Sequence, residues 1–315
     1  MGSTNMSYLN PKTVILIGIP GLEHVQFWIG FPFFSVCLVA LLGNVILIII
    51  ISLHKPMFYF LAMLSLTDMG MSISTLPTVL RIFWFDAKEI EMNTCVAQMY
   101  FIHTFSLMES AVLLAMAFDR YVAICDPLRY ATILTPTLIT KIGIAALLRS
   151  AFAMIPLLAQ LAFFPFCYSH ILSHSYCLHQ DVIRLACADT KFNVIYGMVM
   201  ITLLWGMDSL GIFMSYVFIL HSVLKISSQE GRFKALNTCA SHICAVLILY
   251  VPMIGLSVVH RFAKHSSPFI HIFMAHIYLL VPPVLNPIIY SVKTKQIHQG
   301  FLHLVFPLRI SSSVM

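Results

Sequence analysis

Long apolar runs, separated by short polar segments, dominate the pattern along this chain. Seven windows reach about 20 apolar residues or more, the length that a helix needs to cross a hydrocarbon layer. Their expected limits are 27–51, 57–83, 94–121, 137–162, 193–222, 234–259 and 270–291. No repeat or low-complexity linker interrupts them in the sequence. The pattern therefore predicts an all-α membrane protein built as one seven-transmembrane helix bundle.

More polar segments flank these runs. Residues 1–26 lack the basic start and apolar core of a cleavable signal peptide, so the first run is expected to act as its own insertion signal. The predicted organisation is an extracellular N-terminus over 1–26 and a transmembrane domain over 27–291. A short amphipathic helix and a cytoplasmic tail are expected over 292–315.

Composition agrees with a chain whose main solvent is lipid. The 315 residues are 60% hydrophobic and only 10% charged, against about 25% charged residues in an average soluble domain. A soluble fold would need far more polar side chains to cover its surface. The composition therefore excludes an ordinary soluble domain.

Loop charges predict an N-terminus outside and a C-terminus in the cytoplasm, because cytoplasmic loops carry an excess of Lys and Arg. In this orientation the inner side carries Lys55, Arg120, Arg129, Lys141, Lys225, Arg232, Lys234, Lys293, Lys295 and Arg309. The outer side carries half as many: Lys12, Lys88, Arg184, Lys191 and Lys264. Asn5 begins an N-glycosylation sequon, Asn5-Met6-Ser7, which is usable only on the outer side.

Half of the eight cysteines fall where oxidation is expected, on the outer side. We predict that Cys95 pairs with Cys177 and that Cys167 pairs with Cys187, one of the three connectivities that four cysteines allow. The other four lie in spans or at the inner face and are expected to be free thiols: Cys37, Cys125, Cys239 and Cys244.

The segment MAFDRYVAICDPLRY (116–130) closely resembles the signature at the inner end of the third helix of olfactory receptors, a branch of the rhodopsin-like G-protein-coupled receptors. Other segments resemble the family in the same order: LHKPMFYFLAMLSLTD (53–68), Ser215-Tyr216, KALNTCASH (234–242) and PPVLNPIIYSVKTKQI (282–297). Three more resemble the class I, or fish-like, subgroup, and are family 51-like: GIPGLEHVQFWIGFP (18–32), DPLRYATIL (126–134) and GLSVVHRF (255–262). That subgroup is associated with fairly polar odorants, carboxylic acids among them.

The resemblance implies a switch at the inner ends of the helices. In the family, Arg120 is held in the resting state and released toward the G protein in the active state. Arg232, Phe233 and Lys234 stand where many relatives have a restraining acid, so Asp119 should be the main restraint. The expected switch residues are Asp119, Arg120, Tyr121, Tyr250, Pro252, Asn286, Pro287 and Tyr290. The alternative for Arg120 is a plain interfacial anchor.

Ionisable residues inside spans are costly and call for a reason. In the family register Asp68 and Glu109 lie close together in the bundle centre, and two adjacent buried carboxylates do not both stay ionised without help. They either share a proton or hold a cation, for which a sodium ion is the candidate cofactor. Arg149 and Asp208, in the fourth and fifth spans, are expected to make internal polar contacts.

The candidate ligand site lies toward the outer end of the bundle. Tyr250, Ile254, Ser257 and Arg261 follow helical spacing along one stripe of the sixth span. Arg261 is expected to bind an anionic or strongly polar head group, because a guanidinium binds a carboxylate through two parallel hydrogen bonds. The alternatives are a headgroup-facing Arg261 or a salt bridge to Asp181 or Asp189. Ser257 and His103 are expected to assist Arg261, with His179 and Gln180 as a lid and Phe152, Ile201 and Ile254 as apolar walls.

Other classes of protein find little support. The sequence contains no HExxH, no GxSxG and no phosphate-binding glycine loop, so we expect no enzyme activity. His170, His174, Cys177 and His179 fit no closed zinc site, so no metal is expected there. Two related halves with broken helices, typical of a transporter, are absent from the sequence.

The predicted function is that of an odorant receptor in the plasma membrane. Its expected partners are a small-molecule odorant, a stimulatory heterotrimeric G protein that raises cyclic AMP, and membrane lipids, with no nucleic acid. Between Asn44 and Leu53 the chain is about four residues shorter than the family pattern. Two alternatives therefore stay open: a chemosensory receptor outside the nose, and a variant that reaches the cell surface poorly.

Overall fold

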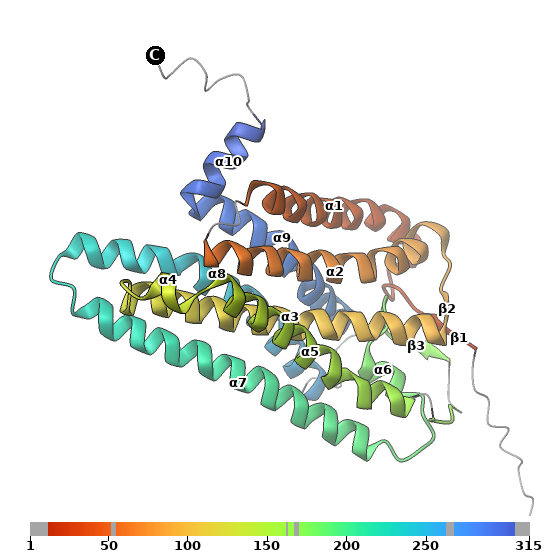
Figure 1. Cartoon of the computed structure of the whole chain (residues 1–315). Helices are drawn as coiled ribbons and strands as arrows, with labels where there is room; N and C mark the ends of the chain where they lie inside the picture. The colour runs from red at the N-terminus through yellow and green to blue at the C-terminus, as the bar shows by residue number, and fades with distance from the viewer. Residues whose placement is uncertain (1–11, 52–54, 162, 167–169, 263–267, 306–315) are drawn as a thin grey trace, which may run out of the picture.

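A bundle of long helices forms the body of the molecule (Figure 1). The computed structural model describes residues 12–51, 55–161, 163–166, 170–262 and 268–305, apart from the side chains of 260–262, 268, 293, 295 and 305. In this part of the chain, seven helices are long and apolar enough to cross a membrane. They are α1 (Gln26–Ile50), α2 (Pro56–Phe85), α3 (Met92–Cys125), α5 (Pro136–Leu161), α7 (Lys191–Leu224), α8 (Gln229–Phe262) and α9 (Pro268–Lys293). The predicted all-α class and the number of spans are confirmed.

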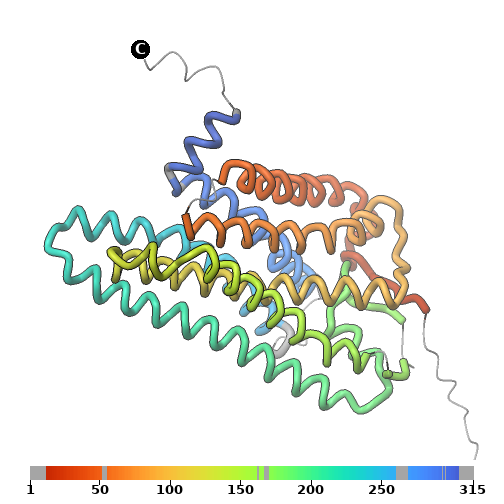
Figure 2. The backbone as a smooth tube through the Cα atoms, viewed as in Figure 1, coloured from red at the N-terminus to blue at the C-terminus, as the bar shows by residue number. Residues whose placement is uncertain are grey.

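The long helices run side by side, and α3 is the central one (Figure 2). Of its most apolar stretch 67% is buried, against 22% for α7 at the edge of the bundle. α3 contacts α2, α5, α7 and α8. A polar side chain on α3 can therefore meet partners from several helices at once, and the sites described below depend on this placement.

Several helices extend beyond the apolar runs that predicted them. α8 begins at Gln229, five residues before the predicted limit of 234, and α7 ends at Leu224, two residues after 222. The helical hydrogen-bond ladder continues through polar turns outside the hydrocarbon, where hydropathy carries no signal. Pro56 and Pro136 open α2 and α5, since a first-turn proline loses no intrahelical hydrogen bond.

A small sheet that the sequence did not predict covers one end of the bundle, which we call the sheet end. Its strands are β1 (Thr13–Leu16), β2 (Glu89–Glu91) and β3 (Ile171–Leu172), in the order β2-β1-β3. β1 pairs antiparallel with β2, and parallel with β3 in the register Ile15 to Ile171. Val14 and Leu16 are fully buried or nearly so. The N-terminal strand thereby joins two loops that are far apart in sequence.

Short helices complete the fold: η1 (Glu23–Val25), α4 (Tyr130–Ile133), α6 (His179–Arg184) and α10 (Lys295–Val305). α10 falls inside the segment expected to be amphipathic and lies at the end of the bundle opposite the sheet, which we call the α10 end (Figure 1). It packs closely on the last turn of α1, because a Cβ added at Gly300 would approach Ile50 Cγ2 to 2.3 Å. Glycine at this position permits the contact.

The predicted Cys95–Cys177 disulfide is present and ties the start of α3 to the segment before α6. Cys187 is also disulfide-bonded, whereas Cys167 and the sequon residue Asn5 lie outside the described residues. Among the described cysteines, the free thiols are the four expected ones: Cys37, Cys125, Cys239 and Cys244.

Candidate functional site

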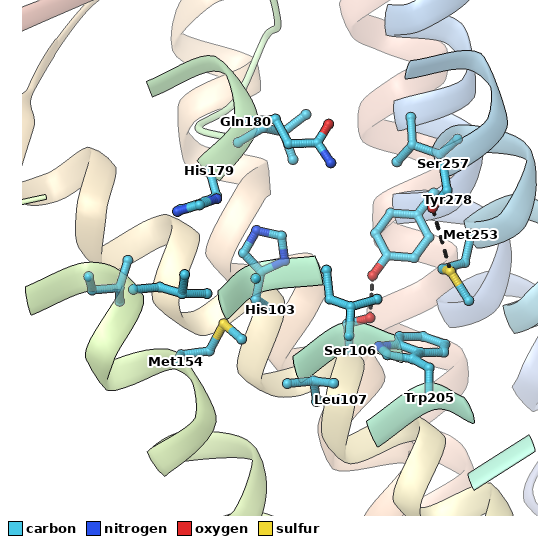
Figure 3. A pocket seen from close by; sticks show the side chains of 16 residues that line it. His103, Ser106, Leu107, Met154, His179, Gln180, Trp205, Met253, Ser257 and Tyr278 are labelled. Carbon is cyan, nitrogen blue, oxygen red and sulfur yellow. Dashed lines mark hydrogen bonds between the residues drawn. The ribbon is translucent and has the colours of Figure 1, made fainter. Parts of the chain in front are cut away.

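A cavity of about 130 Å³ opens inside the bundle beneath the sheet end (Figure 3). Five long helices, α3, α5, α7, α8 and α9, surround it, and α6 covers it. Its apolar walls are formed by Leu107, Met154, Leu157, Leu158, Leu178, Gly197, Ile201, Trp205, Met253 and Leu256. Apolar walls with a few polar groups are typical of small-molecule sites. The volume restricts the ligand to a small molecule, since a cavity of about 150 Å³ holds benzene.

Polar atoms line the same cavity. His103 and His179 are among the lining residues, and the Nε2 atom of each is buried without a hydrogen-bond partner among the described residues. Burial lowers the pKa of His179, which favours its neutral imidazole. Ser106 and Tyr278 are hydrogen-bonded to each other, and Ser257 makes a long contact of 3.9 Å to Met253 Sδ. An unpaired buried polar atom costs free energy. A hydrogen-bond partner for either imidazole Nε2 would therefore stabilise the protein.

Most of the predicted ligand residues meet at this cavity. Those that line it are His103, His179, Gln180, Ile201 and Ser257. Arg261 belongs to the last turn of α8, but its side chain lies outside the described part of the structure. No contact of the guanidinium can therefore be given.

The prediction is wrong for two of the wall residues. Phe152 and Ile254 are 63% and 53% exposed and face away from the cavity. On α8 the stripe that faces inward runs through Met253, Leu256 and Ser257, and Ile254 lies about 100° further round the helix. The apolar residues of a membrane helix give no sign of which face is buried, because the lipid-facing side is equally apolar.

A polar node lies beneath the cavity and joins four helices. The guanidinium of Arg149 on α5 donates two hydrogen bonds to the Asp208 carboxylate on α7, of 2.7 Å to Oδ1 and 2.8 Å to Oδ2. Ser110 on α3 donates to Asp208 Oδ2 at 2.7 Å and lies 3.0 Å from the hydroxyl of Tyr250 on α8. The Tyr250 ring meets Trp205, a cavity residue, edge to face at 5.3 Å. The predicted switch residue Tyr250 therefore lies between the cavity and the node.

The two central carboxylates are brought together as expected. Asn286 Nδ2 lies 3.1 Å from Asp68 Oδ2 and 3.3 Å from Glu109 Oε1. Asp68 and Glu109 are 0% and 1% exposed. Glu109 Oε2 and Asn286 Oδ1 are buried without a hydrogen-bond partner among the described residues, as are Asn44 Oδ1 on α1 and Ser65 Oγ on α2.

The predicted switch residues Asp119 and Arg120 lie at the α10 end. Arg120 Nη2 is 2.9 Å from Asp119 Oδ2, so the restraint on this arginine within the described residues comes from its own neighbour. Tyr130 on α4 donates its hydroxyl to Asp119 Oδ1 at 2.7 Å. Burial, with a further contribution from the charge of Asp119, raises the pKa of Tyr130. Its hydroxyl therefore remains protonated and remains a donor.

The remaining switch residues lie on α3, α8 and α9. Pro252 lies inside a continuous α8, and Pro287 lies inside α9. Tyr121 contacts the ring of Phe218 at 5.9 Å, and the Tyr290 hydroxyl lies 4.0 Å from Met116 Sδ. Tyr290 and Arg120 have no hydrogen bond to each other among the described contacts.

Sequence reasoning missed one polar connection between α7 and α8. His242 lies 2.9 Å, through Nε2, from the carbonyl oxygen of Leu113, and 2.6 Å, through Nδ1, from the hydroxyl of Tyr216. Because a carbonyl only accepts, Nε2 carries the proton and Nδ1 accepts from Tyr216. A signal was present, since both residues fall in segments that resemble family signatures. Tyr130 was missed as well, although it too falls in segments that resemble family signatures. Ser106 and Tyr278 were also missed, and a hydroxyl in an apolar run gives no comparable signal.

Among the described residues, no group of three or more His, Cys, Asp or Glu side chains is arranged to hold a metal ion. His174, one of the four residues considered above as zinc ligands, donates from Nδ1 to the Asp181 carboxylate. Cys177 is held in its disulfide.

Comparisons with known proteins agree with this geometry. Residues 33–307 match the family model described as olfactory receptor. The chain is 55% identical to human "Olfactory receptor 51L1" over 96% of its own length and 98% of that protein, and 56% identical to human "Olfactory receptor 51G2" over 95% and 96%. It is 52% identical to mouse "Olfactory receptor 51E2" over 96% and 95%. The crystal structure of squid rhodopsin superposes with a TM-score of 0.72 at 16% identity, covering 95% of this chain and 92% of that one.

Proposed function

The chain belongs to the olfactory receptor family, and we propose that it detects small carboxylic acids and signals through a stimulatory G protein that raises cyclic AMP. The family and the rhodopsin-like fold make it a multi-pass plasma-membrane receptor for odorants that acts through a G protein and is not an enzyme.

The observation that carries the acid proposal is the small apolar cavity whose lining includes two histidines, His103 and His179. Ser257 lines this cavity, and Arg261 follows it by four residues, on the same side of the helix toward its end. A short acid would place its chain against the leucine and methionine walls. Its carboxylate would lie near His103 and Ser257, with Arg261 as the counter-charge.

We further propose that the sheet end faces outward. Lys and Arg residues are more numerous at the α10 end of the bundle, and such an excess is typical of the cytoplasmic side of a membrane protein. The Cys95–Cys177 disulfide supports this orientation, because disulfides form and persist on the oxidising side of the membrane. An odorant would then enter beneath α6.

Replacing Arg261 by alanine tests the acid proposal. The response to straight-chain carboxylic acids, measured as cyclic AMP, should need about 100-fold more ligand, because a charged hydrogen bond contributes about 1.5–3 kcal/mol and each 1.4 kcal/mol is tenfold. Responses to the matched alcohols should change little. An N-terminal epitope tag, labelled on intact cells, normalises the response to surface level and tests the orientation.

Arg184→Ala is the matched control, because Arg184 is an exposed cation on α6 that does not line the cavity. Equal potency of acids on the wild type and on Arg261→Ala would remove the anchor role. An effect of the same size in Arg184→Ala would mean that general electrostatic attraction, not a bound carboxylate, sets the potency.

We also propose that the Asp68–Glu109 pair binds a sodium ion. Among the described contacts the two carboxylates have no ion pair with a basic residue, and together with Asn286, whose Oδ1 is unpartnered among the described residues, they offer the oxygen ligands that a hard cation prefers. The ion would offset the repulsion between the two carboxylates and would favour the arrangement in which they stay close. Sodium should therefore lower the basal activity.

Basal nucleotide exchange on the G protein, measured on membranes in sodium or in an equal concentration of choline, tests the ion. Sodium should lower exchange in the wild type by about two- to fivefold, the size of a coupling near 1 kcal/mol, and should have no effect in Glu109→Gln. Ser72→Ala is the control, because Ser72 donates to the main-chain carbonyl of Asp68 and leaves both carboxylates in place. Equal exchange in both salts for the wild type would favour a shared proton instead.

A further inference from the structure

The lid over the cavity is a helix too short to be stable by itself. α6 has six residues, whereas isolated helices shorter than about 12 residues are marginal in water. It presents His179 and Gln180 to the cavity (Figure 3). The direction in which these two side chains point is therefore set by the contacts that α6 makes with the rest of the molecule.

One set of contacts fixes the chain just before α6. Cys177 is joined to Cys95 on α3 and donates its main-chain N–H to Gln98 Oε1 at 2.9 Å. Tyr176 donates to the carbonyl of Ala275 at 3.0 Å, and its ring stacks on His276 of α9. These contacts hold the chain before α6. After α6, Cys187 is disulfide-bonded and donates its N–H to the carbonyl of Pro165 at 2.8 Å. Both ends of the lid are therefore held, and what remains to be set is the rotation of α6 about its own axis.

A polar contact made by α6 itself sets this rotation. Asp181 is 4% exposed and accepts a hydrogen bond from Nδ1 of His174, which is 2% exposed. Leaving a buried carboxylate without its hydrogen-bond partner is costly. α6 therefore keeps the rotation that places Asp181 against His174, and this rotation turns His179 and Gln180 toward the cavity.

His174 is itself held by the sheet. It follows β3 by two residues, and β3 lies in register with the N-terminal strand β1. Ile15 donates its N–H to the carbonyl of His170 at 2.7 Å, and Ile17 donates to that of Leu172 at 3.2 Å. Val182, which follows Asp181 on α6, is fully buried in the same apolar cluster as Val14 and Leu172. The N-terminal segment is thus connected to the lid through a continuous set of contacts.

We infer that Asp181 is a positioning residue of the ligand site: through its hydrogen bond to His174, it fixes α6 so that His179 and Gln180 face the cavity. The inference rests on the proposed role of the cavity in ligand binding. Loss of the pair should lower the potency of the ligand but leave the maximal response and the basal activity unchanged, because neither residue contacts the G-protein end.

Amide hydrogen exchange over residues 178–186 of the receptor purified in lipid nanodiscs tests the inference without a ligand. Exchange reports the local opening of a segment. In Asp181→Ala and in His174→Ala it should accelerate about tenfold, which corresponds to about 1.4 kcal/mol. The double variant should be no faster than either single variant, because both changes remove the same contact. Asp189→Ala is the matched control, an exposed acid in the same loop paired with Lys191 at 3.7 Å.

A pair exchange separates positioning from general stability. In His174→Asp/Asp181→His the donor and the acceptor change places, so slow exchange over 178–186 should return. In the same receptors, cyclic AMP responses to butanoic acid should show about tenfold lower potency for each single variant, with equal maxima after correction for surface level.

Unchanged exchange over residues 178–186 in Asp181→Ala would overturn the inference. So would faster exchange that spreads equally through α3 and α9, because the pair would then stabilise the whole fold. If the acids fail to activate the wild type while the exchange results hold, the proposed ligand class is wrong and the positioning role of Asp181 stands.

Discussion

Arg149→Leu is expected to remove most of the protein from the cell surface. The change leaves the Asp208 carboxylate, which is 1% exposed, without the two hydrogen bonds of 2.7 and 2.8 Å that neutralise it. Breaking a buried ion pair on one side costs about 3–5 kcal/mol, a large part of the 5–15 kcal/mol that stabilises a typical folded protein. Flow cytometry of an epitope-tagged receptor and thermal melting of the solubilised protein would measure the loss.

The double variant Arg149→Leu/Asp208→Asn decides whether the loss comes from an unpaired charge. Asparagine keeps an oxygen that accepts the hydrogen bond of Ser110 and carries no charge, so surface level should recover to at least half of the wild type if desolvation of Asp208 dominates. Arg129→Leu is the matched control, because Arg129 forms a loose pair of 3.8 Å with Asp126 and its side chain is 73% exposed. Wild-type surface levels in Arg149→Leu would contradict the argument.

Tyr130→Phe is expected to raise ligand-independent cyclic AMP about tenfold. The phenol contributes a 2.7 Å hydrogen bond to Asp119, the carboxylate that holds Arg120 at 2.9 Å. A hydrogen bond to a charged group contributes about 1.5–3 kcal/mol, and each 1.4 kcal/mol shifts a two-state equilibrium tenfold. Without the phenol, Asp119 is less firmly held, and the family resemblance of residues 116–130 then implies that Arg120 is released more often toward the G protein.

Two further variants make this experiment specific. Thr132→Val, on the same short helix, removes a hydroxyl that bonds only to the main chain of Arg129 among the described contacts, and it should leave the basal level unchanged. Arg120→Ala in the Tyr130→Phe background should abolish the increase, because the freed arginine is the proposed contact with the G protein. A basal level that stays at the wild-type value in Tyr130→Phe would mean that Asp119 restrains Arg120 without help from α4.

The positions of the spans were predictable because each one must satisfy its own backbone in hydrocarbon. Only helices of about 20 residues do so, and every predicted run has its helix. The ends were less predictable. α8 continues through the polar residues that follow Gln229, where hydropathy gives no limit and the helix is set by its own hydrogen bonds.

The ligand cavity was only partly predictable. His103 and Ser257 were identified because a polar side chain near the outer end of an apolar run has to face protein or ligand. His179 and Gln180 were expected as a lid because they lie in the loop after Cys177. Apolar residues carry no such information. Phe152 and Ile254 were therefore assigned to the wrong face, whereas Met154, Leu157 and Met253, which form the walls, were not singled out.

By itself, the sequence determined the class of fold, the seven crossings, the family and which polar residues are too costly to lie in lipid without a function. Only the tertiary structure decided their partners. Arg149 donates to Asp208, Tyr130 donates to Asp119, and His174 donates to Asp181. The physical reason is one of range. Insertion into a membrane depends on the hydrophobicity summed along a single helix, whereas a hydrogen bond depends on the rotation and depth of two helices at once, which are set by the packing of the whole bundle.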